Sequence, residues 1–526
     1  MKLARLTAAL LTLLGTIASA QDRLDLDVVA RIRNEGFRNS KAMETARALT
    51  DRIGPRLTGS PDVKEAEEWC KKQFAEWGLA NAHLEAWSPF GRGWKNEFTS
   101  VRMVAPDTTM LVAVPKAWTP GTEAAVKGQV VKAKLAAKED LEKQKGKLAG
   151  KIVLLGDMPE LKPIEKGMLE RYDEKGLTDL AIYRVPAERM QNREEFIKRR
   201  EFRKELNQFL IDEKVLVVID PGSGGDGGTF DVGSGGSYKP GEPIGVPSLV
   251  MSAEHYGRVA RLLADKVDVE LEIDVRNTWY DDENTQYNVL AELPGTDKNP
   301  ELVMIGAHLD SWHSGTGATD NGAGVVAVME AMRILKAIDA KPKRTIRIAL
   351  WTGEEQGLLG SRGYVKEHFG AFPEPTDPVE KELPMSLRKE TGALTVTPEH
   401  AKLAAYFNLD NGTGKVRGIY TQENLAVGPI FKAWLEPLHD LEATTVTTRN
   451  TGGTDHLPFD AVGLPGFQFI QDNVEYSMRT HHSNYDVYER LQREDLMQAS
   501  VVIATFAYNA AMRAEKLPRK PLPKTK

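Results

Sequence analysis

The segment IALWTGEEQGLLGS, Ile348 to Ser361, places two adjacent glutamates just beyond the end of an apolar run. The run ends at Trp351, and a helix-like segment follows Glu355. A short apolar run that leads into a helix is typical of a buried strand in an α/β fold. Two carboxylates at one strand end repel each other, so the pairing of Glu354 and Glu355 indicates a place where positive charge is held.

The same alternation continues through the whole region from Thr285 onward. Its apolar runs are YNVLAEL, ELVMIGAHLD, TIRIALW, LAAYFNLD and GFQFI, and helices are expected at about 324–337, after Glu355 and from about Arg493. Strands alternating with amphipathic helices predict a mixed, mostly parallel sheet sandwiched by helices. Ligands of such sheets bind beyond the carboxyl ends of the strands.

Length and charge narrow the class of protein. A chain of 526 residues, 41% of them hydrophobic, is too long for one ordinary domain, so two domains or a domain with an insertion are expected. Lys and Arg number 69 against 75 Asp and Glu, which gives a net charge of −6. This balance does not favour nucleic acid or an anionic membrane surface as a partner.

The N-terminus has the order of a secretory signal peptide. Lys2 and Arg5 precede an apolar stretch, Leu6 to Ile17, and Ala18-Ser19-Ala20 follows it. The apolar stretch is shorter than the roughly 20 residues that a membrane anchor needs. We therefore expect a signal peptide at residues 1–20, cleavage after Ala20, a secreted or periplasmic protein, and no membrane association after the signal is removed.

The chain has a single cysteine, Cys70, so an intramolecular disulfide is excluded. Apolar residues recur around it at helical spacing, which predicts a buried structural thiol rather than a nucleophile.

Residues 112–276 have a different texture from the rest of the chain. The short apolar runs GQVVKAK, GKIVLLGD, KVLVVID and VPSLVMS predict strands separated by glycine-, proline- and charge-rich connections. Between two of them, AERMQNREEFIKRREFRKEL mixes both signs of charge and predicts a solvated helix. The glycine-rich segment 220–236 lacks the lysine of a phosphate-binding loop, so we expect a flexible loop, with a lid as the alternative.

Imidazoles and carboxylates gather at the predicted strand ends and in the adjoining loops. They are His308, Asp310, Asp320, Glu354, Glu355, Asp410, His481, His482 and Asp486. Nitrogen and oxygen ligands without a usable thiol suit zinc or a related divalent ion. There are more groups than one tetrahedral site with an open water position needs, so two metals that share a bridging carboxylate fit the count.

Five motifs carry a family resemblance: GAHLDSWHSGTGATDNGAG, WTGEEQGLLGS, NLDNG, GGTDHLPF and THHSNYD, in this order. They resemble the co-catalytic zinc exopeptidase family, which contains secreted leucyl aminopeptidases and glutamate carboxypeptidases. The region between the matching parts resembles a protease-associated domain, mainly through VPSLVMSAEHYGRVARLL. The resemblance implies a zinc exopeptidase catalytic domain at 21–111 and 277–515, an inserted β-rich protease-associated domain at 112–276, and a tail at 516–526 that we expect to be disordered.

The resemblance also implies a role for each site residue. Asp320 would bridge two zinc ions. His308 and Asp410 would complete one zinc site, and Glu355 and His482 the other. Asp310 would fix the tautomer of the His308 imidazole, and Glu354 would be the general base for a metal-bound hydroxide.

The neighbouring histidines His481 and His482 need a choice. In extended backbone their side chains point to opposite sides, so only one can readily bind metal, and His482 heads the H-S-x-x-D run that matches the family ligand. His481 stands where many of these aminopeptidases have a tyrosine, as in the carboxypeptidase Q subgroup. It is therefore a candidate for stabilising the oxyanion or for packing beside the site. His313 and His456 are candidates for supporting the ligands or contacting substrate.

The resemblance implies a dinuclear zinc exopeptidase that hydrolyses short peptides. We favour cleavage at the free N-terminus, as an aminopeptidase or dipeptidase, with carboxypeptidase Q-like or glutamate-carboxypeptidase-like action as the alternative. A non-catalytic receptor-type binding protein is less favoured because all five ligand positions and Glu354 are present. A one-zinc glutaminyl-cyclase-like acyl transferase would differ in metal count. The sequence leaves a homodimer open, and the inserted domain could restrict substrate length or mediate dimer contacts.

Overall fold

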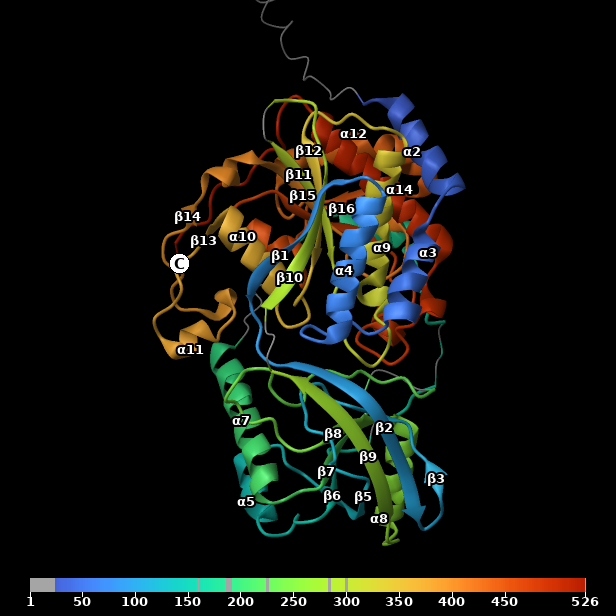
Figure 1. Cartoon of the computed structure of the whole chain (residues 1–526), viewed down its shortest axis with the longest axis vertical. Helices are drawn as coiled ribbons and strands as arrows, with labels where there is room; N and C mark the ends of the chain where they lie inside the picture. Colours follow the sequence, from blue (N-terminus) through green and yellow to red (C-terminus); the bar gives the residue numbers. More distant parts are fainter. Residues whose placement is uncertain are drawn as a thin grey trace, which may run out of the picture.

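Two eight-stranded sheets organise the chain, one in each half of the molecule in Figure 1. The computed structural model describes residues 24–525 except 159, 164, 166, 186–191, 224–226, 282–284 and 299–300. The expected signal peptide, residues 1–20, lies outside the described residues. We call residues 93–280 the inserted domain, because their sheet interrupts the first one, and the rest of the described chain the main domain.

The sheet of the main domain is mixed. Its strands, in spatial order, are β1 (Ala80–Pro89), β10 (Thr285–Leu293), β12 (Thr345–Trp351), β11 (Leu302–His308), β15 (Leu403–Asn408), β18 (Gly466–Gln471), β16 (Val416–Tyr420) and β17 (Thr445–Thr447). The four central strands, β12, β11, β15 and β18, run parallel to one another. Their carboxyl ends therefore meet at one edge of the sheet.

Helices cover both faces of this sheet, which confirms the predicted fold class. One face carries α2 (Leu26–Arg38), α3 (Ala42–Arg47), α4 (Pro61–Glu76), α9 (Ala323–Ala337), α12 (Gly428–Leu435) and α14 (Arg493–Met512). The other carries α10 (Leu359–His368) and α13 (His456–Ala461). Figure 1 shows β1 and β10 between α10 on one side and α4 and α9 on the other.

The central strand β11 shows why the layers form. Its side chains alternate between two cores: Val303 and Ile305 pack with α9 and α14, whereas Leu302 and Met304 pack with α10 and α13. All seven residues of the strand are buried. Burying one such apolar side chain contributes about 1.5–3 kcal/mol, which explains the unbroken apolar run that the sequence shows here.

The inserted domain is built on the second sheet. In spatial order its strands are β3 (Thr109–Met110), β2 (Gly93–Ala105), β9 (Glu270–Tyr280), β5 (Val126–Ala133), β6 (Ile152–Leu155), β7 (Val217–Pro221), β8 (Ser248–Met251) and β4 (Ala113–Pro115). Its helices are α5 (Lys138–Gln144), α6 (Glu174–Ala181), α7 (Arg193–Asp212) and α8 (Ala253–Ala264). The structure places β2 here, although we expected residues up to 111 in the main domain. The reason is that β2 pairs with β9 along nearly its whole length.

Two further expectations concern Cys70 and the C-terminal segment. Cys70 is a free, buried thiol on α4, in agreement with its helical spacing.

Residues 516–525 contain no helix or strand but pack on the main domain: Leu517 is 3% exposed, and the Arg519 guanidinium donates to the carbonyl of Leu403 at 2.6 Å. These contacts differ from the disordered tail that we expected. None of the described helices combines the length and apolarity needed to cross a membrane.

Candidate active site

The first ligand group lies where β11 and β15 end. His308 is the last residue of β11, and Asp410 follows β15 by two residues. Asp320 comes from the turn 318–322 that precedes α9. The His308 Nε2 atom lies 3.3 Å from Asp320 Oδ1 and 3.4 Å from Asp410 Oδ1. The strand ends thus bring together the three residues that the family resemblance assigns to one metal position.

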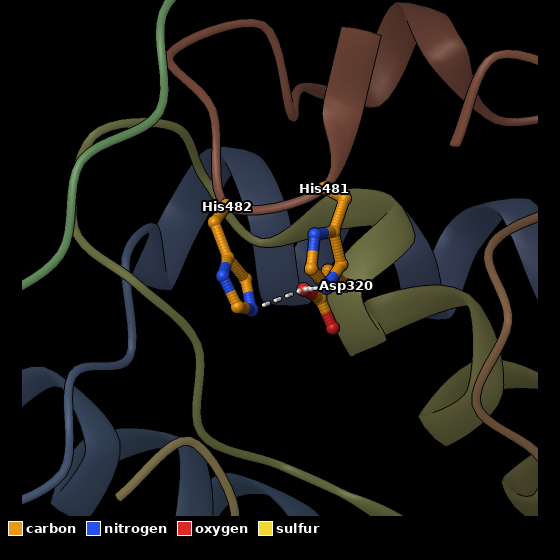
Figure 2. A group of neighbouring side chains, drawn as sticks. All are labelled: Asp320, His481 and His482. Carbon is orange, nitrogen blue, oxygen red and sulfur yellow. Dashed lines mark ion pairs between the residues drawn. The ribbon is translucent and has the colours of Figure 1, made fainter. Parts of the chain in front are cut away.

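The second ligand group lies on the other side of Asp320. The His482 Nε2 atom is 3.3 Å from Asp320 Oδ2 and 2.9 Å from Glu355 Oε2. Figure 2 shows both imidazoles of the His481–His482 pair pointing toward the Asp320 carboxylate. The two oxygens of Asp320 therefore face different ligand groups, as a bridging carboxylate would.

The spacing of these atoms fits a metal better than a set of hydrogen bonds. Ligand atoms bound about 2.0–2.2 Å from a tetrahedral zinc lie about 3.3–3.6 Å from each other, close to three of the four distances above. Three carboxylate oxygens of the cluster are buried without a hydrogen-bond partner in the described part of the chain: Asp320 Oδ2, Glu355 Oε1 and Asp410 Oδ1. Because an unpaired buried charge is costly, these orphaned oxygens indicate a cation position.

The electrostatics of the cluster agree with that assignment. Burial raises the pKa values of Glu354 and Glu355 well above their usual range, and the Asp320 carboxylate raises that of Glu355 further. Burial opposes protonation of His308, but the Asp410 and Glu354 carboxylates hold the pKa of His308 well above its usual value. Without a cation, the buried carboxyl groups of Glu354 and Glu355 thus hold their protons, and divalent cations would favour their ionised forms.

Asp310 fixes the backbone of both adjacent glutamates. Its Oδ1 accepts from the N–H of Glu354 at 3.2 Å, and its Oδ2 accepts from the N–H of Glu355 at 3.3 Å and from the Thr58 hydroxyl at 2.9 Å. The His308 Nδ1 atom lies 3.0 Å from the main-chain oxygen of Asp310 and 3.6 Å from its carboxylate. A carbonyl only accepts, so Nδ1 carries the proton and Nε2 faces the metal position.

Asp486 and Arg56 hold the loops that carry the ligands. The Asp486 carboxylate accepts from the N–H groups of Thr319 at 2.6 Å and Asp320 at 3.1 Å, and burial raises its pKa to about 7. The Arg56 guanidinium is buried and donates to the carbonyls of Leu309 at 2.7 Å and Gly317 at 2.7 Å. These bonds connect the loop after β11 to the turn that contains Asp320.

The histidine pair corrects one expectation. We expected His481 and His482 to point to opposite sides, as in extended backbone. His482 instead has a φ of +55°, and the two rings stack with centroids 3.7 Å apart. The left-handed conformation turns both imidazoles to the same side. The His481 Nε2 atom lies 3.9 Å from Asp320 Oδ2, farther than the corresponding His482 atom.

Comparisons with known proteins agree on one family. The family described as Peptidase family M28 matches residues 288–507. Carboxypeptidase Q from Rattus norvegicus is 25% identical over 488 residues, which are 92% of this chain and 88% of that protein. The crystal structure of a peptidase M28 precursor from Shewanella amazonensis superimposes with a TM-score of 0.65 at 25% identity and covers 95% of this chain and 98% of its own. These matches together support a co-catalytic zinc exopeptidase family for this chain.

The match to Peptidase family M28 and the similarity to carboxypeptidase Q support a zinc metallo-exopeptidase. The zinc aminopeptidase BSAP from Bacillus subtilis shares the fold with a TM-score of 0.55 at 18% identity, covering 90% of this chain and 94% of that one. Histidine nitrogens and carboxylate oxygens are the donor set that zinc takes. The donor set of the two ligand groups described above therefore fits zinc.

The other two histidines near the M28 motifs lie in different surroundings. The His313 Nε2 atom is 2.7 Å from the carbonyl oxygen of Pro115 in the inserted domain, and its ring packs edge-on against Trp94. His456 is buried on α13, where its Nε2 atom is 3.2 Å from the Thr451 carbonyl oxygen. Burial lowers the pKa of each to about 4, so both are neutral at neutral pH.

Several residues around the site were given no role by the sequence. Arg56 lies in a segment that reads only as a glycine- and proline-rich loop. Asp455 is buried beside Ser361, whose hydroxyl donates to it, and burial raises the pKa of Asp455 to about 7. Its place in the GGTDHLPF motif was the available signal. Trp312 lies edge-on to the His482 ring at 5.9 Å between centroids and borders a small cavity with Asp320, Glu355 and Ser483.

Proposed function

We propose that the protein is a dinuclear zinc exopeptidase that hydrolyses short peptides at their free N-terminus, as an aminopeptidase or dipeptidase. The observation that carries the dinuclear part is the placement of Asp320. One of its oxygens lies 3.3 Å from His308 Nε2 and the other 3.3 Å from His482 Nε2. Two metal positions that share one carboxylate explain this arrangement, with Asp410 completing the first and Glu355 the second.

When bound, zinc polarises the scissile carbonyl and lowers the pKa of an attacking water. The general base is then Glu354. Its backbone is fixed by Asp310, and its side chain, which is 9% exposed, lies close enough to His308, Asp410 and Asp455 to feel their charges. Its carboxylate oxygen accepts a proton from the water and gives it to the departing amine nitrogen of the substrate.

His481 is our candidate for stabilising the oxyanion. Its side chain is 48% exposed at the mouth of the site, next to the ligand His482. Burial lowers the pKa of His481, and its neighbour His482 lowers it further, although the Asp320 carboxylate opposes this. A neutral imidazole with a free N–H can donate a hydrogen bond to the developing oxyanion.

Carboxypeptidase action is the second candidate. Its observations are the similarity to carboxypeptidase Q and the position of Arg362 on α10. The Arg362 guanidinium is close enough to the Asp455 and Glu354 carboxylates for their charges to act on it, although burial and Arg388 lower its pKa overall. A cation there could bind the terminal carboxylate of a short peptide.

Hydrolysis of one dipeptide in four forms tests the proposal: free, N-acetylated, C-amidated, and blocked at both ends. Loss of activity on N-acetylation alone supports an aminopeptidase, and loss on either modification supports a dipeptidase. Loss on C-amidation alone would overturn N-terminal cleavage in favour of carboxypeptidase action. Metal analysis of the purified, active protein should give close to two zinc ions per chain, and a fully active protein with one zinc would overturn the dinuclear arrangement.

We also propose that the protein is secreted or periplasmic, on the strength of the N-terminal signal pattern. The inserted domain is proposed to be a protease-associated domain, which its strand-rich composition supports. A homodimer stays a prediction that a sedimentation measurement would decide. The expected partners are short peptides, with no nucleic acid or membrane partner.

A further inference from the structure

The glycine-rich segment of the inserted domain lies against the loop that carries the two active-site histidines. The N–H of Val232 donates to the carbonyl of His482 at 3.0 Å, and the N–H of Asn484 donates to the carbonyl of Phe230 at 3.3 Å. Asp231 and Ser483 form an antiparallel bridge between these bonds. In Figure 2 this green segment passes beside His482. The inserted domain thus adds a short strand to the loop of the active site.

Further contacts fix the position of this strand. The Asn484 side chain accepts from the N–H of Phe230 at 3.0 Å and donates to the carbonyl of Gly228 at 2.9 Å. The side chains of Phe230 and Val232 are fully buried and pack together with Val250 of β8. Residues 228–232 are therefore a fixed part of the site rather than a free loop.

Between these two buried residues, the side chain of Asp231 is exposed. Within the described ranges, no side chain forms a hydrogen bond or ion pair with its carboxylate. Asp231 pairs with Ser483, the residue after His482, and its carboxylate lies close enough to the imidazoles of His481 and His482 for their charges to act on it. An unpaired carboxylate held at this place is available to a cationic group of the substrate.

We propose that Asp231 binds the free α-amino group of the peptide substrate. This inference rests on the proposed N-terminal cleavage. In an N-terminal residue the amino nitrogen lies about 2.5 Å from the scissile carbonyl carbon, so an acceptor for the amine must lie beside the metal positions. Asp320, Glu355 and Asp410 are committed to those positions. Asp231 lies beside the loop of His481 and His482 and supplies the charge that an ammonium group needs.

The geometry also gives the inserted domain a role in substrate length. A peptide with an additional N-terminal residue would carry its amino group one residue, at most about 3.6 Å, farther from the scissile bond. Because residues 228–232 are fixed to the loop of His482, Asp231 cannot follow the amine outward. The same carboxylate therefore selects for cleavage after the first residue.

A comparison of two substrates in three variants tests this role. The substrates are alanyl-leucine and its des-amino analogue propanoyl-leucine. The variants are Asp231→Asn, Asp231→Glu and, as a control in the same domain, Asp157→Asn, whose exposed side chain pairs with Lys132. Asp231→Asn should lower kcat/KM for alanyl-leucine about tenfold, mainly by raising KM. For propanoyl-leucine, which lacks the amine, the same variant should leave kcat/KM unchanged, or the inhibition constant if the analogue is not cleaved. Asp231→Glu should retain part of the activity, and Asp157→Asn all of it.

The outcomes separate this inference from the proposed function. If wild-type protein cleaves both substrates equally well, N-terminal recognition itself is wrong, and the inference falls with it. If the wild type requires the amine but Asp231→Asn affects both substrates to the same extent, Asp231 only supports the histidine loop. If Asp231→Asn changes neither, the amine binds elsewhere. Zinc content and the unfolding temperature of each variant show that the site is intact.

Discussion

The Asp310 carboxylate accepts a hydrogen bond from the main-chain N–H of Glu354 at 3.2 Å. A second bond, from the N–H of Glu355, uses the other oxygen of the same carboxylate. One carboxylate therefore holds the backbone of both glutamates, the one proposed to bind metal and the one proposed to act as the general base. We expect the proposed roles of Glu354 and Glu355 to depend on this anchor.

Asp310→Asn tests this anchor. An asparagine side chain has one acceptor and one donor group, so at least one of the two glutamate N–H groups loses its partner, at a cost of about 1–3 kcal/mol. We expect kcat to fall by at least tenfold with a smaller change in KM. Steady-state kinetics and zinc analysis check this. Thr58→Val is the comparison: it keeps the Asp310 carboxylate and removes the hydroxyl bond to it, together with the bond that the same hydroxyl accepts from the Gly353 N–H. Full activity in Asp310→Asn would contradict the role of Asp310.

Glu354→Gln should separate proton transfer from metal binding. Glutamine keeps the shape of the side chain but cannot accept the proton, so we expect kcat to fall about 10²- to 10⁴-fold with zinc content unchanged. The matched control is Glu355→Gln, which should lose zinc because its carboxylate belongs to the second ligand group. The assignment would be reversed if Glu354→Gln lost zinc and Glu355→Gln kept it.

Zinc removal should destabilise the main domain. The orphaned oxygens of Asp320, Glu355 and Asp410 are left without a compensating charge when the cations leave. Zinc that binds only the folded state stabilises that state. Dialysis against a chelator should therefore lower Tm by roughly 5 °C or more, and adding zinc should restore it. Scanning calorimetry measures the shift. Asp320→Asn should show a smaller response to the chelator, and an equal response would place the stabilising metal elsewhere.

The sequence predicted the parts of the site that follow strand ends. His308, Glu355 and Asp410 come together because β11, β12 and β15 are parallel neighbours. The apolar runs indicate the strands and mostly parallel pairing, but not this order. Other features depend on contacts between distant segments. The stacking of His481 on His482 depends on a single positive φ, and the position of Asp231 depends on the pairing of the inserted domain with residue Ser483. Neither leaves a periodic pattern in the sequence.

Glu67 on α4 is a buried acid outside both ligand groups. It is 1% exposed, its Oε1 atom has no hydrogen-bond partner in the described ranges, and burial raises its pKa to about 8. The folded protein therefore holds the proton more tightly than the unfolded chain, in which the pKa is about 4.5. The resulting stabilisation is complete below about pH 4.5 and is lost as the pH rises through about 8.

Glu67→Gln should remove this dependence. In the wild type, Glu67 contributes a loss of up to about 1.4 kcal/mol in the free energy of unfolding per pH unit between these two pKa values. Glutamine has no charge to bury, so the variant should show a flatter profile and a higher Tm than wild type at pH 8 to 9. Denaturant unfolding at a series of pH values measures this. The neighbouring Glu68→Gln is the control, because Glu68 is exposed and pairs with Lys71. Parallel profiles for the wild type and Glu67→Gln would show that Glu67 titrates normally in the folded protein.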